Sequence, residues 1–176
     1  MSLLKVFAPA ALALLAAGCQ TTNGPVNITQ EVYGNVQPAV SDNWRAVVSR
    51  GGSIAYICPA SRCREPGAIG YSVARVNADA EYLVREKVVS SELVQEIGDT
   101  VSDMTDGQYR QLNVRNLTNK EAAGFETVSS YTGRKGKYYS VSRVGINGNE
   151  VRMITGMGKS LQTARKNLRI GLDGAK

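Results

Sequence analysis

Residues 138–155 have the sequence YYSVSRVGINGNEVRMIT. Apolar residues alternate with polar or small ones on both sides of Asn147-Gly148, which is the pattern of two half-buried strands. An Asn-Gly pair between two such segments is the strongest short signal for a β-hairpin, because both turn residues need positive φ angles. The stretch therefore predicts antiparallel strands at 138–146 and 150–155, and the rest of the fold is expected to form around them.

Further strands are expected before this hairpin. Period-two alternation predicts strands at 109–117 and 125–131, and the turn Gly133-Arg134-Lys135-Gly136 joins the second of them to the hairpin. Nearer the start of the chain, short apolar runs bounded by turn residues predict strands at 44–49, 54–57 and 69–76. We expect about four to six of these strands to form one antiparallel sheet.

A central helix is expected between the early strands and the hairpins. Apolar residues recur three to five positions apart from Ala80 to Met104, which is the spacing of an amphipathic helix. Asn77 or Asp79 is expected to cap its start, and Gly98 is expected to divide it into two pieces.

A second helix is expected at residues 159–172, where Ser160 can act as the cap and the apolar stripe consists of Leu161, Ala164 and Leu168. The sequence therefore predicts an α+β domain, in which the central and C-terminal helices pack on one face of the sheet. The order of hairpins, the Asn-Gly turn and the closing helix are similar to the PsbP-like and DcrB-like families over about residues 44–172. Those families act mostly as binding or assembly modules, so the resemblance implies a non-enzymatic role.

The start of the chain has the features of a secretory signal. Lys5 precedes an apolar run at 6–17, and this run is shorter than the roughly 20 residues that a membrane-spanning helix needs. Small residues directly before Cys19 resemble the lipobox of bacterial lipoproteins, although Ala16 stands where that family more often has Leu. The resemblance implies a signal peptide at 1–18 and lipid attachment to the Cys19 thiol. The alternative is a buried apolar helix with a cysteine there by chance.

Lipidation at Cys19 would leave a flexible tether at 19–43 and a single periplasmic domain at 44–176. Gln20 follows the cysteine, whereas Asp at that place favours the inner membrane in the lipoprotein family, so we expect the outer membrane. The processed chain of 158 residues would carry 20 basic and 15 acidic side chains, a net charge of +5. This excess fits ordinary solubility as well as anionic partners, and an exported protein is not expected to meet nucleic acid.

Cys58 and Cys63 lie close together in the sequence. In an oxidising compartment such a pair is best interpreted as a structural disulfide. A redox pair, with Arg62 and Arg64 lowering a thiol pKa, is an alternative, but a thioredoxin-like motif has two intervening residues and this one has four. Free thiols are the third possibility.

The chain contains no histidine, which removes histidine-based nucleophilic catalysis and most neutral-pH general bases. No metal and no cofactor are expected. The segment Gly156-Met157-Gly158-Lys159-Ser160 resembles the end of a phosphate-binding loop, but Met153 stands where the first glycine would be needed, so a helix-capping turn is favoured. Carboxylates spaced for one helix face would permit glycan hydrolysis or form an ordinary solvated face: Glu92, Glu96, Asp99 and Asp103.

Aromatic and cationic side chains gather around the turn at 133–136. Aromatic rings beside cations can hold sugars or acidic groups, although alternate residues such as Tyr139 would also serve the core. The residues predicted to form this surface are Tyr131, Arg134, Lys135, Lys137, Tyr138 and Arg143. We therefore expect a membrane-anchored binding protein whose partner is an envelope protein, an anionic glycan or a lipid. The alternatives are a glycan-acting enzyme and a surface lipoprotein that contacts a host or phage.

Overall fold

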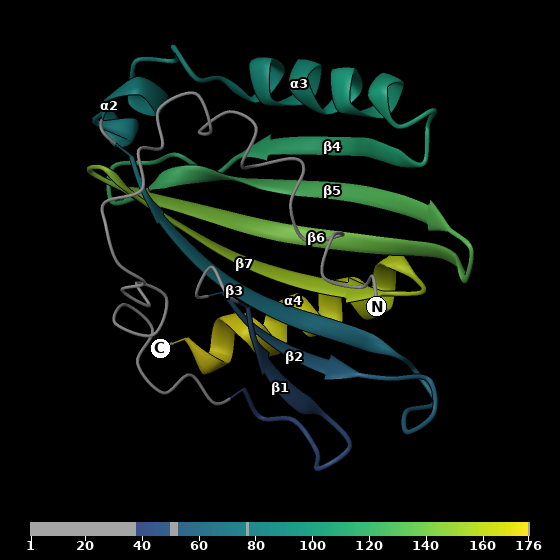
Figure 1. Cartoon of the computed structure of the whole chain (residues 1–176). Coiled ribbons are helices and arrows are strands. Elements are labelled where there is room, and N and C mark those ends of the chain that lie inside the picture. The colour runs from purple at the N-terminus through teal and green to yellow at the C-terminus, as the bar shows by residue number, and fades with distance from the viewer. Residues whose placement is uncertain (1–37, 50–52, 77, 176) are drawn as a thin grey trace.

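Seven strands form one antiparallel sheet in the computed structural model, which describes residues 38–49, 53–76 and 78–175 (Figure 1). The strands are β1 (Arg45–Val48), β2 (Ile54–Cys58), β3 (Gly67–Arg75), β4 (Tyr109–Asn116), β5 (Ala123–Gly133), β6 (Gly136–Asn147) and β7 (Glu150–Gly158). The helices are α2 (Ala80–Arg85), α3 (Ser91–Met104) and α4 (Leu161–Gly174). The strand order is β1-β2-β3-β7-β6-β5-β4, so the predicted hairpin β6–β7 lies inside the sheet.

The turn of the β6–β7 hairpin differs by one residue from the prediction. Asn147 pairs with Glu150, so the two-residue loop is Gly148-Asn149 and not Asn147-Gly148. Gly148 has a φ angle of +57°, whereas neither asparagine is among the described residues with positive φ. A glycine with positive φ at the first loop position is the pattern of a type II′ turn, in which only that residue needs the left-handed region.

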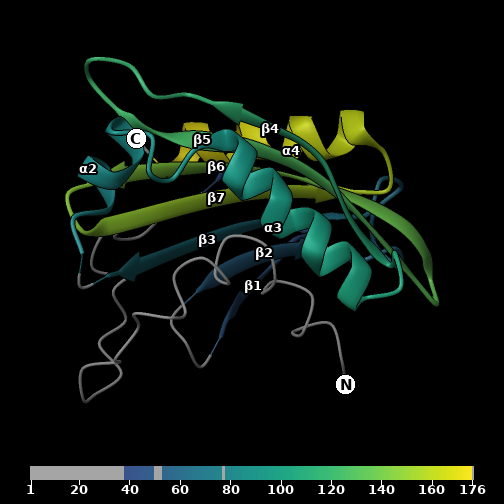
Figure 2. The same ribbon diagram turned by 90° about the horizontal axis from the view of Figure 1, so that it is seen from above.

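Both faces of the sheet carry buried apolar side chains. Val141 and Val144 are three residues apart on β6, so their side chains point to opposite faces. Val141 belongs to a cluster that includes two residues of α4, whereas Val144 packs in a different cluster near α2. We call these surfaces the α4 face and the α3 face, after the helix that lies on each one (Figure 2).

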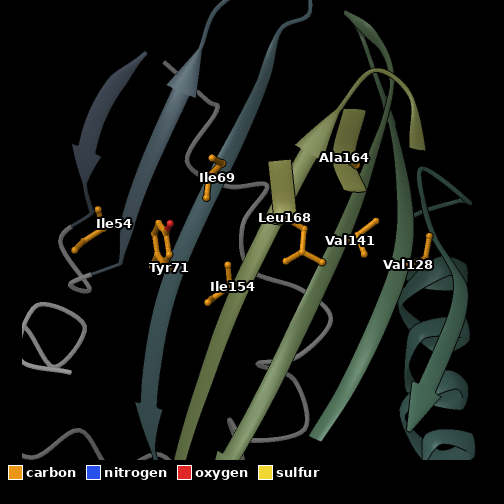
Figure 3. Packing of buried hydrophobic residues seen from close by; sticks show 8 residues of the cluster. All are labelled: Ile54, Ile69, Tyr71, Val128, Val141, Ile154, Ala164 and Leu168. Atoms are coloured by element: carbon orange, nitrogen blue, oxygen red, sulfur yellow. The ribbon is translucent and has the colours of Figure 1, made fainter. Parts of the chain in front are cut away.

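Helix α4 packs closely over the middle of the α4 face. Its cluster contains side chains from five strands and the helix: Ile54, Ile69, Tyr71, Val128, Val141, Ile154, Ala164 and Leu168 (Figure 3). A Cβ atom on Gly156 would overlap the backbone of Ala164 and Leu168, so the glycine is what lets the helix approach β7. The Tyr71 hydroxyl donates to the Gly171 carbonyl across 3.0 Å, and Ser160 caps the helix as predicted.

Helices α2 and α3 lie on the α3 face. Asp79 caps α2, which is one of the two predicted caps. The chain then breaks between α2 and α3, where Lys87 has a φ angle of +59° and Ser90 caps α3. The predicted break at Gly98 is wrong, because this glycine is buried inside α3 against the side chain of Gln111 on β4.

The α+β class and the antiparallel sheet are confirmed, with two differences. The sheet has seven strands instead of four to six, because β3 pairs with β7 over nine residues and brings β1 and β2 into the same sheet. The central and C-terminal helices lie on opposite faces and not on one (Figure 2). Each face offers apolar residues to a helix, as Phe125 does under α3 and Val128 under α4.

Candidate binding surface

The β5–β6 hairpin extends the sheet at the end opposite the Gly148 turn (Figure 1). Tyr131 pairs with Tyr138, and Gly133 pairs with Gly136, so Arg134 and Lys135 form the two-residue loop. The side chains of Arg134, Lys135 and Lys137 are exposed, and none of them forms an ion pair within the described residues. We call residues 131–138 the hairpin tip.

The predicted surface residues divide between the two faces of the hairpin. Tyr131 and Tyr138 are register partners and lie on the α3 face, where both are half-buried. Lys137 lies on the α4 face, and its Nζ is 5.1 Å from the centre of the Tyr139 ring. This distance is within the range of a cation–π interaction. The structure therefore places two tyrosines on one side of the tip, a lysine on the other and two cations at the end.

Arg143 does not belong to the hairpin tip. It is six residues from Lys137, and six residues of extended strand span roughly 20 Å. Its guanidinium group contacts the Glu126 carboxylate at 3.2 Å, and Arg115 contacts the other oxygen of that carboxylate at 3.1 Å. The buried Nε of Arg143 has no hydrogen-bond partner within the described residues. Arg143 is therefore part of a separate charged group on the α4 face.

The predicted Cys58–Cys63 disulfide is present, with 5.9 Å between the Cα atoms. Cys58 is buried at the end of β2, and the loop after it turns where the Arg62 and Cys63 N–H groups donate to the Pro59 carbonyl. Arg62 and Arg64 are exposed. The bond thus closes a tight loop beside α4.

A pocket of about 230 Å³ lies next to the disulfide. Its lining includes Trp44, Cys58, Thr163, Asn167 and Ile170. The Asn167 amide inside it donates to the Met157 carbonyl at 2.7 Å. Sequence analysis missed this pocket because its lining comes from three separate parts of the chain, and no short motif relates them.

The carboxylates of α3 lie on an exposed helix face. Glu92, Glu96, Asp99 and Asp103 are all exposed. A hydrogen bond from the Ser90 hydroxyl lowers the pKa of Glu92 below its usual value, and the backbone and Ser91 act in the same direction. A glycosidase needs one carboxylic acid whose pKa is raised, so this shift is in the wrong direction for a general acid. No group of three or more potential metal ligands occurs among the described residues.

The segment 156–160 serves the packing of α4. Gly156 and Gly158 each face the first turns of the helix, where a Cβ atom would overlap it. The Ser160 hydroxyl accepts a hydrogen bond from the Thr163 N–H at 3.1 Å. This segment is therefore a helix-capping turn, as the missing glycine at Met153 predicts.

The lipid-attachment prediction at Cys19, and the signal peptide before it, fall on residues outside those that the structure describes. Pro38 and Val40, which the sequence analysis assigns to the tether, pack against α4. Within the described residues, every helix is too short or too polar to span a bilayer.

No family model and no curated protein sequence matches the chain. Among solved structures, the fold is similar to cyanobacterial PsbP (CyanoP) from Synechocystis sp. PCC 6803, with a TM-score of 0.50, 12% identity, and coverage of 77% of this chain and 82% of that chain. It is also similar to LpqN from Mycobacterium tuberculosis, which is involved in cell envelope biogenesis, with a TM-score of 0.47, 11% identity, and coverage of 76% and 78%. The likeness to PsbP confirms the predicted PsbP-like fold, and at this identity it concerns the fold alone.

Proposed function

We propose that this protein is a lipid-anchored envelope protein whose domain is a non-enzymatic binding module, and that the hairpin tip contacts its partner. The observation that carries the proposal is the set of three exposed cations at the tip, which have no ion pair within the described residues. Exposed cations beside tyrosines suit an acidic protein surface, an anionic glycan or a lipid headgroup. No cofactor is part of this role.

Capture of the partner in intact cells tests the hairpin tip. The double variant Lys135→Glu and Lys137→Glu reverses two charges at the tip, so crosslinking to the partner should fall strongly. The matched control is Lys87→Glu with Lys120→Glu, which changes the net charge equally at two exposed positions away from the tip. Equal capture by wild type and tip variant would contradict the role of the tip.

The anchor is tested separately. Addition of acyl chains to Cys19 should make the protein fractionate with outer membranes, since two or more chains give stable anchoring. We expect labelled palmitate to enter the wild-type chain and not Cys19→Ala. A Cys19→Ala chain that still fractionates with membranes would refute lipid anchoring through this residue. The domain of the anchored wild-type protein is expected to face the periplasm.

The non-enzymatic assignment is supported by the chemistry of the available side chains. The sequence has no histidine, and the Glu92 pKa is lowered by its hydrogen bonds. Replacement of Glu92, Glu96 and Asp99 with the corresponding amides should leave peptidoglycan turnover unchanged. A loss of turnover in this triple variant would instead favour a glycan-acting enzyme.

A further inference from the structure

Charge is unevenly distributed between the two faces of the molecule. Residues 79–108, which contain α2 and α3, have eight acidic and two basic side chains, a net charge of −6. Residues 109–175, which contain β4 to β7 and α4, have four acidic and twelve basic side chains, a net charge of +8. Because α3 and α4 lie on opposite faces, the acidic layer lies on the α3 face near the edge strand β4, and the basic helix α4 lies on the other side of the sheet (Figure 2).

Arg115 and Arg143 lie side by side with one carboxylate on the sheet part of the α4 face. Arg115 on β4 and Arg143 on β6 flank Glu126 on β5, and this single carboxylate contacts both guanidinium groups. The group keeps a net charge of +1, and the arginine side chains are 58% and 42% exposed. The carboxylate therefore holds both cations in place without neutralising them.

Two more arginines extend this surface from the helix. The flank of α4 that contains Asn167 and Ile170 faces the pocket beside β2. Arg165 and Arg169 are four residues apart, and the helical period of 3.6 puts them on the other flank, toward β6 and β5. Both are exposed, and neither forms an ion pair within the described residues. We call Arg115, Arg143, Arg165 and Arg169 the arginine face.

The chain also enters the domain on this side of the sheet. A Cβ atom placed on Gly174, in the last turn of α4, would lie 2.8 Å from the Cα of Pro38. Pro38 is therefore packed directly on α4. About 19 residues separate Pro38 from Cys19, and covalent geometry limits a chain of that length to a span of at most about 65 Å. A domain tethered within that distance of a bilayer can bring its α4 face onto that bilayer.

We propose that the arginine face docks on anionic lipid headgroups of the bilayer to which Cys19 anchors the protein, so that the acidic α2–α3 layer points away from the membrane. This inference rests on the proposed lipid anchor, which determines the membrane on which the protein docks. The docking itself needs only the four arginines. Guanidinium groups form bidentate hydrogen bonds with phosphate, the group common to anionic lipids. The repulsion between the acidic layer and the same headgroups fixes which side turns toward them.

Vesicle binding by an unlipidated chain tests the docking alone. The chain from residue 19 with Cys19→Ala contains every described residue and lacks the acyl anchor. We expect it to sediment with vesicles of phosphatidylglycerol and phosphatidylcholine in equal parts, and not with phosphatidylcholine alone. Each cation near an anionic surface strengthens binding about fivefold, so Arg165→Glu with Arg169→Glu should weaken it by roughly 25-fold or more. Arg165→Gln with Arg169→Gln is the milder variant should the charge reversal fail to fold.

The matched control is again Lys87→Glu with Lys120→Glu. Lys120 follows Asn119, whose carbonyl accepts a hydrogen bond from Arg85 of α2, so both control lysines lie near the acidic layer. At 0.1 M salt, charges more than about 10 Å from the headgroups are screened, and the control should bind almost as wild type does.

The proposal would be overturned by no binding of the wild-type chain to anionic vesicles, by equal binding of the arginine variants, or by an equal loss of binding in the control. The arginine variants could also keep their binding to vesicles and lose only binding to a soluble acidic polysaccharide. That result would assign the arginines to a glycan and would overturn the proposal as well. None of these results bears on whether Cys19 is acylated. Labelled palmitate decides that question separately.

Discussion

The α4 face of the sheet is filled with large apolar side chains, whereas the centre of the α3 face carries pairs of hydroxyl groups. On the α4 face, Ile69, Tyr71 and Val141 are at most 1% exposed. On the α3 face, Ser129 and Ser140 form a cross-strand hydrogen bond of 2.7 Å, and Ser142 and Thr155 form one of 2.8 Å.

The two long helices differ in the same way. Four residues of α4 are buried, and the helix packs on β3, β6 and β7. Only Val94 and Gly98 are buried in α3, which contacts chiefly the edge strand β4, and Met104 at its end is 80% exposed. We infer that packing on the α4 face determines the stability of the domain, whereas α3 is a lightly held acidic layer.

The largest expected difference between the faces concerns two glycines. In Gly156→Ala the new methyl group would overlap the backbone of α4, so the whole helix must move and stability should fall by about 3 kcal/mol or more. In Gly98→Ala the methyl group would press on Gln111 at the sheet edge, but α3 can shift and alanine favours the helix by about 1 kcal/mol. Urea unfolding of both variants measures the contrast. Similar losses would show that α3 is held as firmly as α4.

The disulfide links the end of β2 to the loop that follows it, beside α4, and it should stabilise this part of the α4 face. Closing the loop between Cys58 and Cys63 should contribute about 2 kcal/mol in the chain-entropy model. Cys58→Ala with Cys63→Ala should therefore lower stability by at least this amount, and a reducing agent should have no effect on the variant. Unfolding midpoints with and without reductant provide the measurement. An unchanged midpoint on reduction of the wild-type chain would mean that the loop is held without the bond.

How far the sequence predicts these features depends on the range of the interactions. Local signals work well: Asp79 and Ser160 are caps, and the strands that alternate apolar and polar residues are present. The hairpin register differs by one residue because Asn147-Gly148 and Gly148-Asn149 both place the glycine where a tight turn can use it. Which of them forms depends on pairing along the whole of β6 and β7.

Features that depend on packing between distant segments could not be predicted. Gly98 has the sequence pattern of a helix break, but the neighbour that it packs against, Gln111, lies outside the helix on β4. Arg143 is near the hairpin tip in sequence. Its ion-pair partner Glu126 lies on β5, however, so Arg143 belongs to a charged group separate from the tip. The assignment of each helix to a face needs the sheet order, which no local pattern contains.

Alkaline pH should affect the α3 face selectively. Burial raises the pKa of Tyr109 on β4 to about 12, against 10.0 for an unburied tyrosine. The folded state therefore holds this proton more tightly, so its contribution is complete below about pH 10 and is lost as pH rises toward 12. The loss should reach roughly 2 kcal/mol by about pH 12, since each pKa unit corresponds to about 1.4 kcal/mol. In Tyr109→Phe the unfolding free energy should change less over this range, and equal changes in both proteins would assign the effect to other groups.

The smallest expected effect separates the two helices most clearly. Ser160→Ala and Ser90→Ala each remove one helix cap, at a cost of about 1 kcal/mol. Because α4 belongs to the main core, loss of its cap should lower the protection of sheet amides against hydrogen exchange along with that of the helix. Loss of the α3 cap should lower protection only in α3, since that helix can open while the sheet stays intact. Gln162→Ala, at an exposed position of α4, should change neither. If Ser90→Ala also lowered protection in β6 and β7, α3 would be part of the same cooperative unit, and the division between a structural face and a lightly held acidic layer would have to be abandoned.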